Sequence, residues 1–183
     1  MEISLIFLLY FVYLVIRYFT MDHDTPAEKD RVRFEKGIVL LQQRDYEGAY
    51  DYFNQAVRQN PKSALAYACR GKCQLALQNH YSAIYDLTQA INRDNTLADC
   101  YLDRGIAYYT VEQYQDAFRE FDKAVWHFRG EQPDAYRWRA IARLQLSQHT
   151  QAESDLNRAV MLGDENSAFM LQQPPFMRGM VNQ

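Results

Sequence analysis

The stretch "RGIAYYTVEQYQDAFREFDKAV", residues 104–125, decides the fold of this chain. It places Gly105 inside a pattern that otherwise reads as continuous helix, although an interior glycine costs roughly 1 kcal/mol relative to alanine. Counting from that glycine, an alanine follows 12 residues later (Ala117), an aromatic residue 16 later (Phe121) and an alanine 19 later (Ala124). A helix that accepts this cost, with small residues at fixed offsets, predicts a close approach between two helices.

The same register recurs along the chain. Its anchor residues stand at positions 37, 71, 105 and 140, so consecutive anchors lie 34, 34 and 35 residues apart. This spacing divides residues 30–166 into four tandem units with the bounds 30–63, 64–97, 98–131 and 133–166. The small residues of the register are the anchors and the alanines 12 residues after them: Gly37, Gly71, Gly105 and Ala140, then Ala49, Ala83, Ala117 and Ala152.

This pattern resembles the tetratricopeptide repeat. In that family each unit is a pair of antiparallel helices, A and B, and stacked units form a right-handed superhelix with a concave groove. The resemblance implies an all-α fold, an α-solenoid of four helix-turn-helix repeats. It also gives the small residues a purpose, because a larger side chain where helix A is crossed by helix B would hold the two backbones apart. The alanines are expected opposite the anchors.

The chain departs from the family pattern in two places. The family's proline at the end of helix B is present only as Pro61, and Asn95, Arg129 and Asp164 stand at the equivalent positions. The third unit, which ends in "FRGEQPD", is one residue longer than the others. We expect this extra residue to shift the angle between the third and fourth units.

Residues 3–19, "ISLIFLLYFVYLVIRYF", carry a single charge, Arg17. Seventeen helical residues extend roughly 25 Å, slightly less than the roughly 30 Å hydrocarbon core of a bilayer. Interfacial aromatic residues and a snorkelling arginine make a spanning helix feasible. Residues 1–20 are therefore predicted to be an N-terminal transmembrane anchor, and residues 21–29 a juxtamembrane linker and helix start.

Two other interpretations of this segment remain open, a cleaved signal peptide and a helix buried in a partner protein. The signal peptide is disfavoured because no Lys or Arg precedes the apolar run and "RYFTMD" offers no small-residue cleavage site. Basic residues follow the segment, so the positive-inside tendency predicts a single-pass protein whose repeats face the cytoplasm. The basic residues are Arg17, Lys29, Arg31, Arg33 and Lys36.

Residues 167–183 are expected to form a short capping helix and a tail. The helix should end near Gln173, because Pro174 and Pro175 follow it. Such a helix would cover the apolar face that the last unit leaves open. The tail, with Phe176 and Met180, remains open between an ordered arm, a frayed end and a motif that binds a partner.

Composition and motifs give no sign of catalysis. The net charge is −3 at pH 7, so a broad basic surface for nucleic acid is not expected. The three cysteines include no Cys-x-x-Cys pair, the four histidines are far apart in the register, and no nucleophile–base pair can be argued. Charged residues alternate along helix faces as solvated pairs do, for example Glu120 and Lys123. No enzyme activity, metal site or cofactor is predicted.

Cys69 and Cys73 lie four residues apart on one predicted helix, and Cys100 lies on the next helix A. Two thiols on one turn could bind a soft metal or react. The favoured interpretation is that all three are small buried residues at the contact between successive A helices.

The resemblance assigns the lining of the concave groove to fixed positions of helix A. These positions predict an apolar floor with a few charges, and exposed apolar surface of this kind usually marks an interaction site. Part of this surface could instead belong to the core or be covered by the chain's own ends. The predicted groove residues are Arg31, Phe34, Ile38 and Leu41, then Leu65, Ala68, Lys72 and Leu75, then Asp99, Leu102, Asp103, Ile106 and Tyr109, then Asp134, Arg137, Ile141 and Leu144.

One mode of binding in the family can be tested by comparing its binding residues with the matching positions of this sequence. Family members that grip the acidic tails of cytosolic chaperones share a clamp of Lys, Asn, Asn, Lys and Arg. This sequence offers no carboxylate-binding fork in either register, and its aspartates would repel an anionic tail. The matching positions hold Phe34, Ile38, Cys69, Asp99 and Asp103, or, one unit later, Ala68, Lys72, Asp103, Asp134 and Trp138.

The sequence therefore favours a membrane-anchored scaffold that binds a protein partner. Its groove is expected to bind an apolar or amphipathic helical segment of that partner. An accessory or assembly subunit of a membrane complex is the leading hypothesis. The alternative is a membrane-tethered cochaperone or targeting factor that binds client segments transiently. The first predicts one stoichiometric partner, and the second predicts many weak ones.

Overall fold

The computed structural model describes residues 7, 10–14, 17 and 26–176. The predicted membrane segment therefore lies mostly outside the described residues, as do residues 18–25 and the tail 177–183. Among the residues that are described, no helix is both long enough and apolar enough to cross a membrane.

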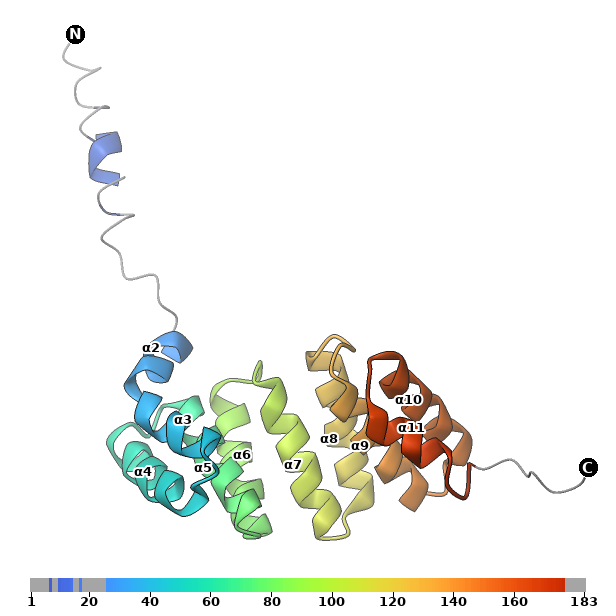
Figure 1. The fold of residues 1–183 in the computed structure, drawn as a ribbon. Helices are drawn as coiled ribbons and strands as arrows, with labels where there is room; N and C mark the ends of the chain where they lie inside the picture. The colour runs from blue at the N-terminus through green and yellow to red at the C-terminus, as the bar shows by residue number, and fades with distance from the viewer. Residues whose placement is uncertain (1–6, 8–9, 15–16, 18–25, 177–183) are drawn as a thin grey trace, which may run out of the picture.

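The chain from residue 26 onward is a row of helices that pack in sequential order (Figure 1). Four antiparallel pairs follow one another within this described part, and the closest packing is between the two helices of a pair and between consecutive pairs. Regular structure in this range is entirely helical, which confirms the all-α prediction. The helices are α2 (Pro26–Arg33), α3 (Glu35–Gln42), α4 (Tyr46–Gln59), α5 (Ala64–Ala76), α6 (His80–Arg93), α7 (Ala98–Thr110), α8 (Tyr114–His127), α9 (Pro133–Gln145), α10 (His149–Met161) and α11 (Glu165–Leu171).

The first A helix is interrupted at Phe34, which separates α2 from α3. The backbone there departs from helical geometry (φ −103°, ψ 15°), yet the N–H of Phe34 still bonds the carbonyl of Asp30 and its own carbonyl still accepts from Ile38. Because the backbone hydrogen bonds continue through Phe34, α2 extends the first A helix beyond the first helix pair. This extension forms one wall of the groove described below.

Each turn inside a pair has the same backbone geometry. One residue, seven positions after the anchor, adopts a left-handed conformation with φ between 60° and 62°. Its own N–H and that of the next residue bond carbonyls of the preceding helix, so the helix end is satisfied in the same way every time. The four residues are Arg44, Gln78, Glu112 and Ser147.

The anchors pack where the sequence predicts a close approach. A Cβ added to Gly105 would lie 2.5 Å from Cε1 of Phe121, and one added to Gly71 would lie 2.9 Å from Cγ of Leu87. At these two glycines the nearest side chain therefore belongs to the large residue 16 positions later, rather than to the alanine 12 positions later. At Gly37 it belongs to Tyr52, followed by Phe53. All four alanines of the second position are fully buried: Ala49, Ala83, Ala117 and Ala152.

A ladder of arginines joins the units, and the alternation of charges along single helices does not predict it. Arg70 donates to both carboxylate oxygens of Asp86, at 2.7 Å each, and Arg139 does the same to Asp155 at 2.9 and 2.6 Å. In the unit between them, Arg104 donates twice to Oε2 of Glu120, at 2.9 and 2.5 Å. We call these three pairs the arginine ladder: Arg70–Asp86, Arg104–Glu120 and Arg139–Asp155.

Each ladder arginine also reaches back to the preceding unit. Nη1 of Arg104 donates to Oγ1 of Thr88 at 2.9 Å, and the other two make equivalent bonds, to Asn54 at 2.9 Å and to Asp122 at 2.7 Å. One guanidinium therefore ties its own pair together and fastens it to the pair before. The first unit has Lys36 and Tyr52 at the ladder positions and lacks this link.

The ladder corrects the interpretation of Glu120 as one half of a solvated pair. The bond from Lys123 is present at 2.9 Å, but only 6% of Glu120 is exposed, and Arg104 is its buried partner. Alternation of charge along a helix face shows which residues are neighbours on that helix. This alternation does not reveal an ion-pair partner on a neighbouring helix, such as Arg104 for Glu120.

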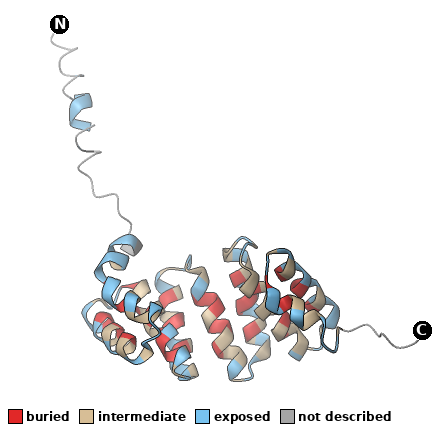
Figure 2. Cartoon of the chain, viewed as in Figure 1, coloured by how far each residue is buried: buried red, intermediate tan, exposed pale blue. Residues whose placement is uncertain are grey.

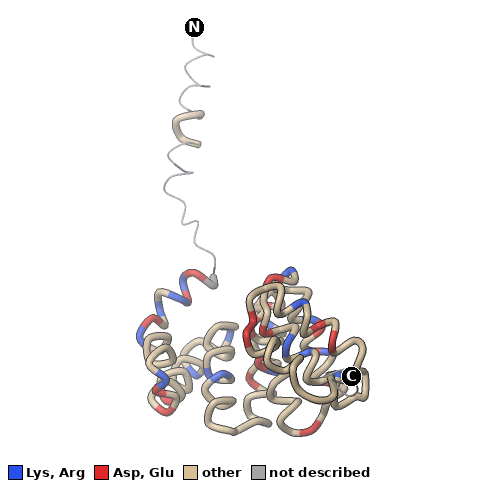
Figure 3. The backbone as a smooth tube through the Cα atoms, turned by 45° about the vertical axis from the view of Figure 1, so that its right-hand side comes forward, with Lys and Arg blue, Asp and Glu red and all other residues tan. Residues whose placement is uncertain are grey.

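The helix α11 covers the end of the row. Met170, Leu171 and Phe176 pack on the buried cluster of Ala140, Ala152 and Leu156, and the carboxylate of Asp164 caps the helix by accepting from the N–H of Ser167. The buried residues follow the inner faces of successive helices (Figure 2). Charges of both signs are spread over the described part of the chain (Figure 3).

Candidate functional site

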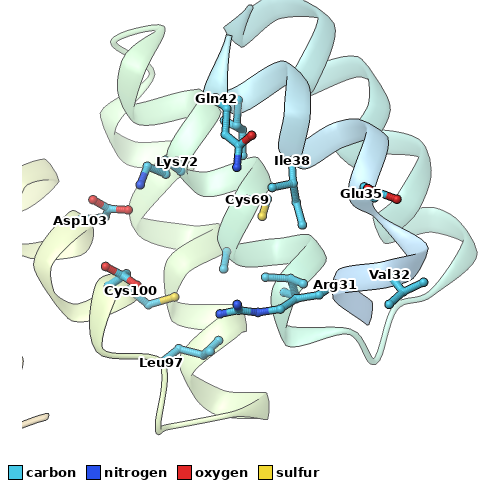
Figure 4. Close-up of a pocket in the computed structure, with 14 residues that line it drawn as sticks. Arg31, Val32, Glu35, Ile38, Gln42, Cys69, Lys72, Leu97, Cys100 and Asp103 are labelled. Carbon is cyan, nitrogen blue, oxygen red and sulfur yellow. The ribbon is translucent and has the colours of Figure 1, made fainter. Parts of the chain in front are cut away.

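A groove of about 750 Å³ opens between the first three A helices (Figure 4). Its walls come from α2 and α3 on one side and from α7 on the other, and α5 lies between them. The lining residues are Arg31, Val32, Glu35, Ile38, Leu41, Gln42, Leu65, Ala68, Cys69, Lys72, Leu97, Asp99, Cys100 and Asp103.

The centre of the groove is apolar because of how α5 is spaced. Leu65, Ala68, Cys69 and Lys72 follow one another at intervals of three, one and three residues, which places them on one face of the helix. The first three supply apolar surface, and Lys72 ends the stripe with a charge. Ile38 and Leu41 of α3 and Leu97 before α7 extend this floor on either side.

Charges stand at the two rims of the groove. Asp99 and Asp103 are four residues apart on α7, and Lys72 of α5 points toward Asp103 (Figure 4). Arg31 of α2 extends across the groove from the opposite wall (Figure 4). Within the described part of the chain, none of these four residues makes a side-chain hydrogen bond or an ion pair within 4.0 Å.

The surroundings of Asp103 disfavour the charged form of its carboxyl group. Its pKa is raised from the usual value of 3.8 to about 6, mainly because burial disfavours the charged form. Lys72 lowers this pKa and the negative charge of Asp99 raises it, and both effects are smaller than that of burial. Other groups that line the groove beside it are the thiols of Cys69 and Cys100 and the charges of Arg31 and Glu35. Asp103 is therefore about half protonated near pH 6.

The three cysteines are free and buried, as the favoured interpretation predicted. Burial raises the thiol pKa of Cys69 and of Cys73 to about 12, and that of Cys100 still higher. All three remain protonated at neutral pH and behave as small apolar side chains. Over the described residues, no cluster of three or more His, Cys, Asp or Glu side chains could hold a metal ion.

The structure brings only part of the predicted groove set into this hollow. Arg31, Ile38, Leu41, Leu65, Ala68, Lys72, Asp99 and Asp103 line it. Phe34 does not, because only 2% of it is exposed and its ring packs edge-on against Phe53. Leu102, Ile106 and Tyr109 lie in or against the core between α7, α8 and α9. Leu75 packs against a buried cluster of the second and third units, and Leu144 packs against a buried cluster of the fourth.

The predicted groove residues of the fourth unit have partners inside the chain. Arg137 donates to Asp164 at 2.5 Å and also bonds Asp134, so it fixes the cap of α11. Ile141 is half-buried. These residues do not line the hollow at the first three A helices.

The structure adds residues that the family positions left out. Val32, Glu35 and Gln42 line the wall that α2 and α3 form, and Leu97, Cys69 and Cys100 complete the floor. The wall follows from the extension of the first A helix beyond its unit. The unbroken helical pattern before Gly37 was the signal that could have shown it.

Comparisons with known proteins agree with this architecture. A family model described as tetratricopeptide repeat matches residues 34–96 and 102–168. Human neutrophil cytosol factor 2 is 32% identical over 99 residues, which are 54% of this chain and 18% of that protein. The chain thus spans less than a fifth of that relative.

Two solved structures share the fold. One, titled as a functional characterization of Pseudomonas aeruginosa pilF, superposes with a TM-score of 0.69 at 18% identity, covering 79% of this chain and 67% of that one. The other, the first repeat domain of Spaghetti (RPAP3) bound to the HSP90 peptide SRMEEVD, gives a TM-score of 0.58 at 22% identity, covering 60% and 88%. At these identities the likeness concerns the fold alone.

Proposed function

The chain belongs to the tetratricopeptide repeat family, and from this we propose that it is a scaffold whose groove at α2, α3, α5 and α7 holds a segment of a partner protein. The observation that carries the proposal is the groove itself, with its apolar floor and unpaired charges at its rims. Its function is binding rather than catalysis, because its thiols are protonated and it presents no nucleophile beside a base.

A membrane anchor is the second part of the proposal. Residues 3–19 have the composition of a spanning helix, and the residues of this segment that the structure describes are helical, with Phe7 and Phe11 exposed by 71% and 64%. Apolar side chains presented in this way need lipid or a protein to cover them. An anchor also raises the effective concentration of groove and partner at the bilayer, so a modest affinity suffices. The repeats are proposed to face the cytoplasm.

Within this class we favour an accessory or assembly subunit of a membrane complex. The rival is a membrane-tethered cochaperone that binds client segments transiently. The RPAP3 structure binds an HSP90 peptide with the sequence SRMEEVD, whereas this groove presents Asp99 and Asp103 at the positions that match the second Lys and the Arg of the family clamp. Two carboxylates at these positions oppose an acidic tail, which disfavours that form of the rival.

Proximity crosslinking in native membranes tests both parts. Three forms are compared: the whole chain, the chain without residues 1–20, and the whole chain with Ala68→Arg, which fills the floor of the groove. Ala76→Arg is the matched control, because Ala76 is exposed on the same helix and does not line the groove. One stoichiometric partner that is lost with Ala68→Arg and kept with Ala76→Arg supports the groove.

The forms separate the two parts of the proposal. Loss of membrane association without residues 1–20 supports the anchor. A full set of crosslinks that survives Ala68→Arg means that the groove is not the binding site. Many substoichiometric partners, all dependent on the groove, favour the cochaperone over the subunit.

A further inference from the structure

We propose that the groove selects a helical polypeptide segment that carries a Lys or Arg between Asp99 and Asp103, and an aliphatic side chain three or four residues away on the apolar floor. This partner chemistry rests on the proposed function of the groove. It specifies the charge of the segment, which the family membership leaves open.

The balance of charge in the groove carries the argument. Asp99 and Asp103 are four residues apart on α7, and like charges at this spacing repel each other on one face of a helix. Lys72 points toward Asp103 (Figure 4), and among the described residues it forms no ion pair within 4.0 Å with either aspartate. The charged residues that line the groove are Arg31 and Lys72 against Glu35, Asp99 and Asp103, so the groove has an excess of negative charge. A cation from a partner would remove that excess.

Other carboxylates in the same fold show what this rim lacks. Asp86 and Asp155 each accept a bidentate arginine from the neighbouring helix, and Glu120 accepts two bonds from Arg104. Asp103 is half-buried and receives no such bond. A guanidinium or ammonium group of a partner would make the kind of charge-assisted bond that the chain itself makes elsewhere.

The width of the groove sets the spacing in the partner. The apolar floor lies on α5 and the carboxylates on the neighbouring α7, and packed helices have axes roughly 8–10 Å apart. Side chains three or four residues apart on a helix have Cβ atoms roughly 5–6 Å apart, and a long Lys or Arg stem covers the remaining distance. An aliphatic residue on the floor therefore places a basic residue of the same helix face at the carboxylates.

A display selection tests this chemistry. The full-length protein in detergent is panned against a library of random helical peptides, and clones are kept if they bind the unmodified chain and lose binding with Ala68→Arg but not with Ala76→Arg. We expect these groove-dependent clones to be enriched in a Lys or Arg three or four residues from Leu, Ile or Val.

One enriched peptide is then synthesised and measured by calorimetry. Replacing its basic residue with norleucine, or combining Asp99→Asn with Asp103→Asn, should weaken binding roughly tenfold, and the two changes together should cost little more than one. Asp51→Asn is the matched control, because Asp51 is exposed on α4 and does not line the groove. It should leave the affinity unchanged.

The outcomes separate this inference from the function on which it rests. Groove-dependent clones without basic enrichment, or with an affinity that ignores the two aspartates, overturn the charge selection and leave the scaffold standing. Absence of any clone sensitive to Ala68→Arg, at full folding by circular dichroism, counts against both. Dimerisation that Ala68→Arg abolishes would make a second copy the occupant and would also overturn the inference.

Discussion

Two sets of charged residues in this molecule differ in their partners: those of the arginine ladder are paired and buried, and those of the groove are unpaired among the described residues. In the arginine ladder every carboxylate has a guanidinium against it, and the exposed fraction of the acidic side chain is 1% for Asp86, 8% for Glu120 and 6% for Asp155. At the groove, Asp99, Asp103 and Lys72 stand close to one another without an ion pair in the described part of the chain. The ladder joins each A helix to the B helix of its own unit, whereas the groove charges lie on two successive A helices, α5 and α7.

The difference separates charges that hold the fold from charges that are available to a partner. A buried ion pair that loses one member leaves an uncompensated charge, so the ladder is sensitive to single substitutions. An unpaired charge at a groove rim contributes little to stability, and its removal costs the fold little. Stability measurements and binding measurements should therefore respond to different residues.

The largest effect is expected from Arg104→Met. This change leaves Glu120 buried with only the exposed Lys123 as a partner, and the free energy of unfolding should fall by about 3 kcal/mol. Urea denaturation followed by circular dichroism measures it. Arg119→Met is the control, because its pair with Asp116 is exposed on both sides and should be worth less than about 0.5 kcal/mol.

A double change sharpens this result. If the loss comes from a charge left buried, Glu120→Met in the Arg104→Met background should recover most of the stability, because both partners are then apolar. Equal losses for Arg104→Met and Arg119→Met would mean that the ladder does not hold the units together.

A smaller effect is expected from Gly105→Ala. The added Cβ would lie 2.5 Å from Cε1 of Phe121, so the ring must shift, at a cost of about 1–3 kcal/mol that the roughly 1 kcal/mol gain in helix propensity only partly offsets. The fourth unit already pairs Ala140 with the smaller Leu156 at these positions. Phe121→Leu in the Gly105→Ala background should therefore restore stability in thermal unfolding. A stabilising Gly105→Ala single variant would contradict the close-packing explanation.

The fold could be predicted from the sequence because its signal is repeated. Small residues at fixed offsets gave the register, and with it the close approach of two helices at Gly71 and Gly105. The side chains that meet these glycines are Leu87 and Phe121, 16 positions later, whereas the sequence pattern predicts the alanines 12 positions later opposite them. The ladder was missed although it is also repeated, with an acidic residue 16 positions after an arginine in three units. A local rule for charges, which compares residues on one helix, cannot see a partner on the next.

The candidate site was predicted only in part, for two physical reasons. Family positions assign groove residues equally to every unit, whereas Phe34 and Leu102 are buried in this chain. Phe34 packs edge-on against Phe53, and Leu102 belongs to the core between α7, α8 and α9. The continuation of the first A helix through Phe34 also adds a wall to the groove, with Val32 and Glu35. Among the described units of this chain, only the first has such an extension. Which positions stay open depends on the side chains that surround each one, within its unit and from the next, and a position in the repeat does not specify them.

Asp103→Asn should raise stability at neutral pH by about 1 kcal/mol, an amount reduced for partial solvent screening. The folded-state pKa of about 6 lies above the usual 3.8, so this carboxyl adds stability below about pH 4 and loses it as pH rises through 6. The melting temperatures of variant and parent should therefore differ most above pH 6. Similar melting temperatures at about pH 7.5, or a larger gap at about pH 4, would contradict the cost assigned to this carboxylate.

The smallest effect on stability is expected from Lys72→Ala. Lys72 is exposed and has no ion pair in the described chain, so the free energy of unfolding should change by less than about 0.5 kcal/mol. Its positive charge lowers the pKa of Asp103, and its removal should therefore raise that pKa above about 6. An NMR titration of the Asp103 carboxyl carbon measures the shift, with Lys62→Ala as the control outside the groove. A lower pKa would mean that Lys72 does not face Asp103. A higher pKa with unchanged stability would mean that Lys72 acts on the groove carboxylate and, unlike the ladder arginines, does not stabilise the fold.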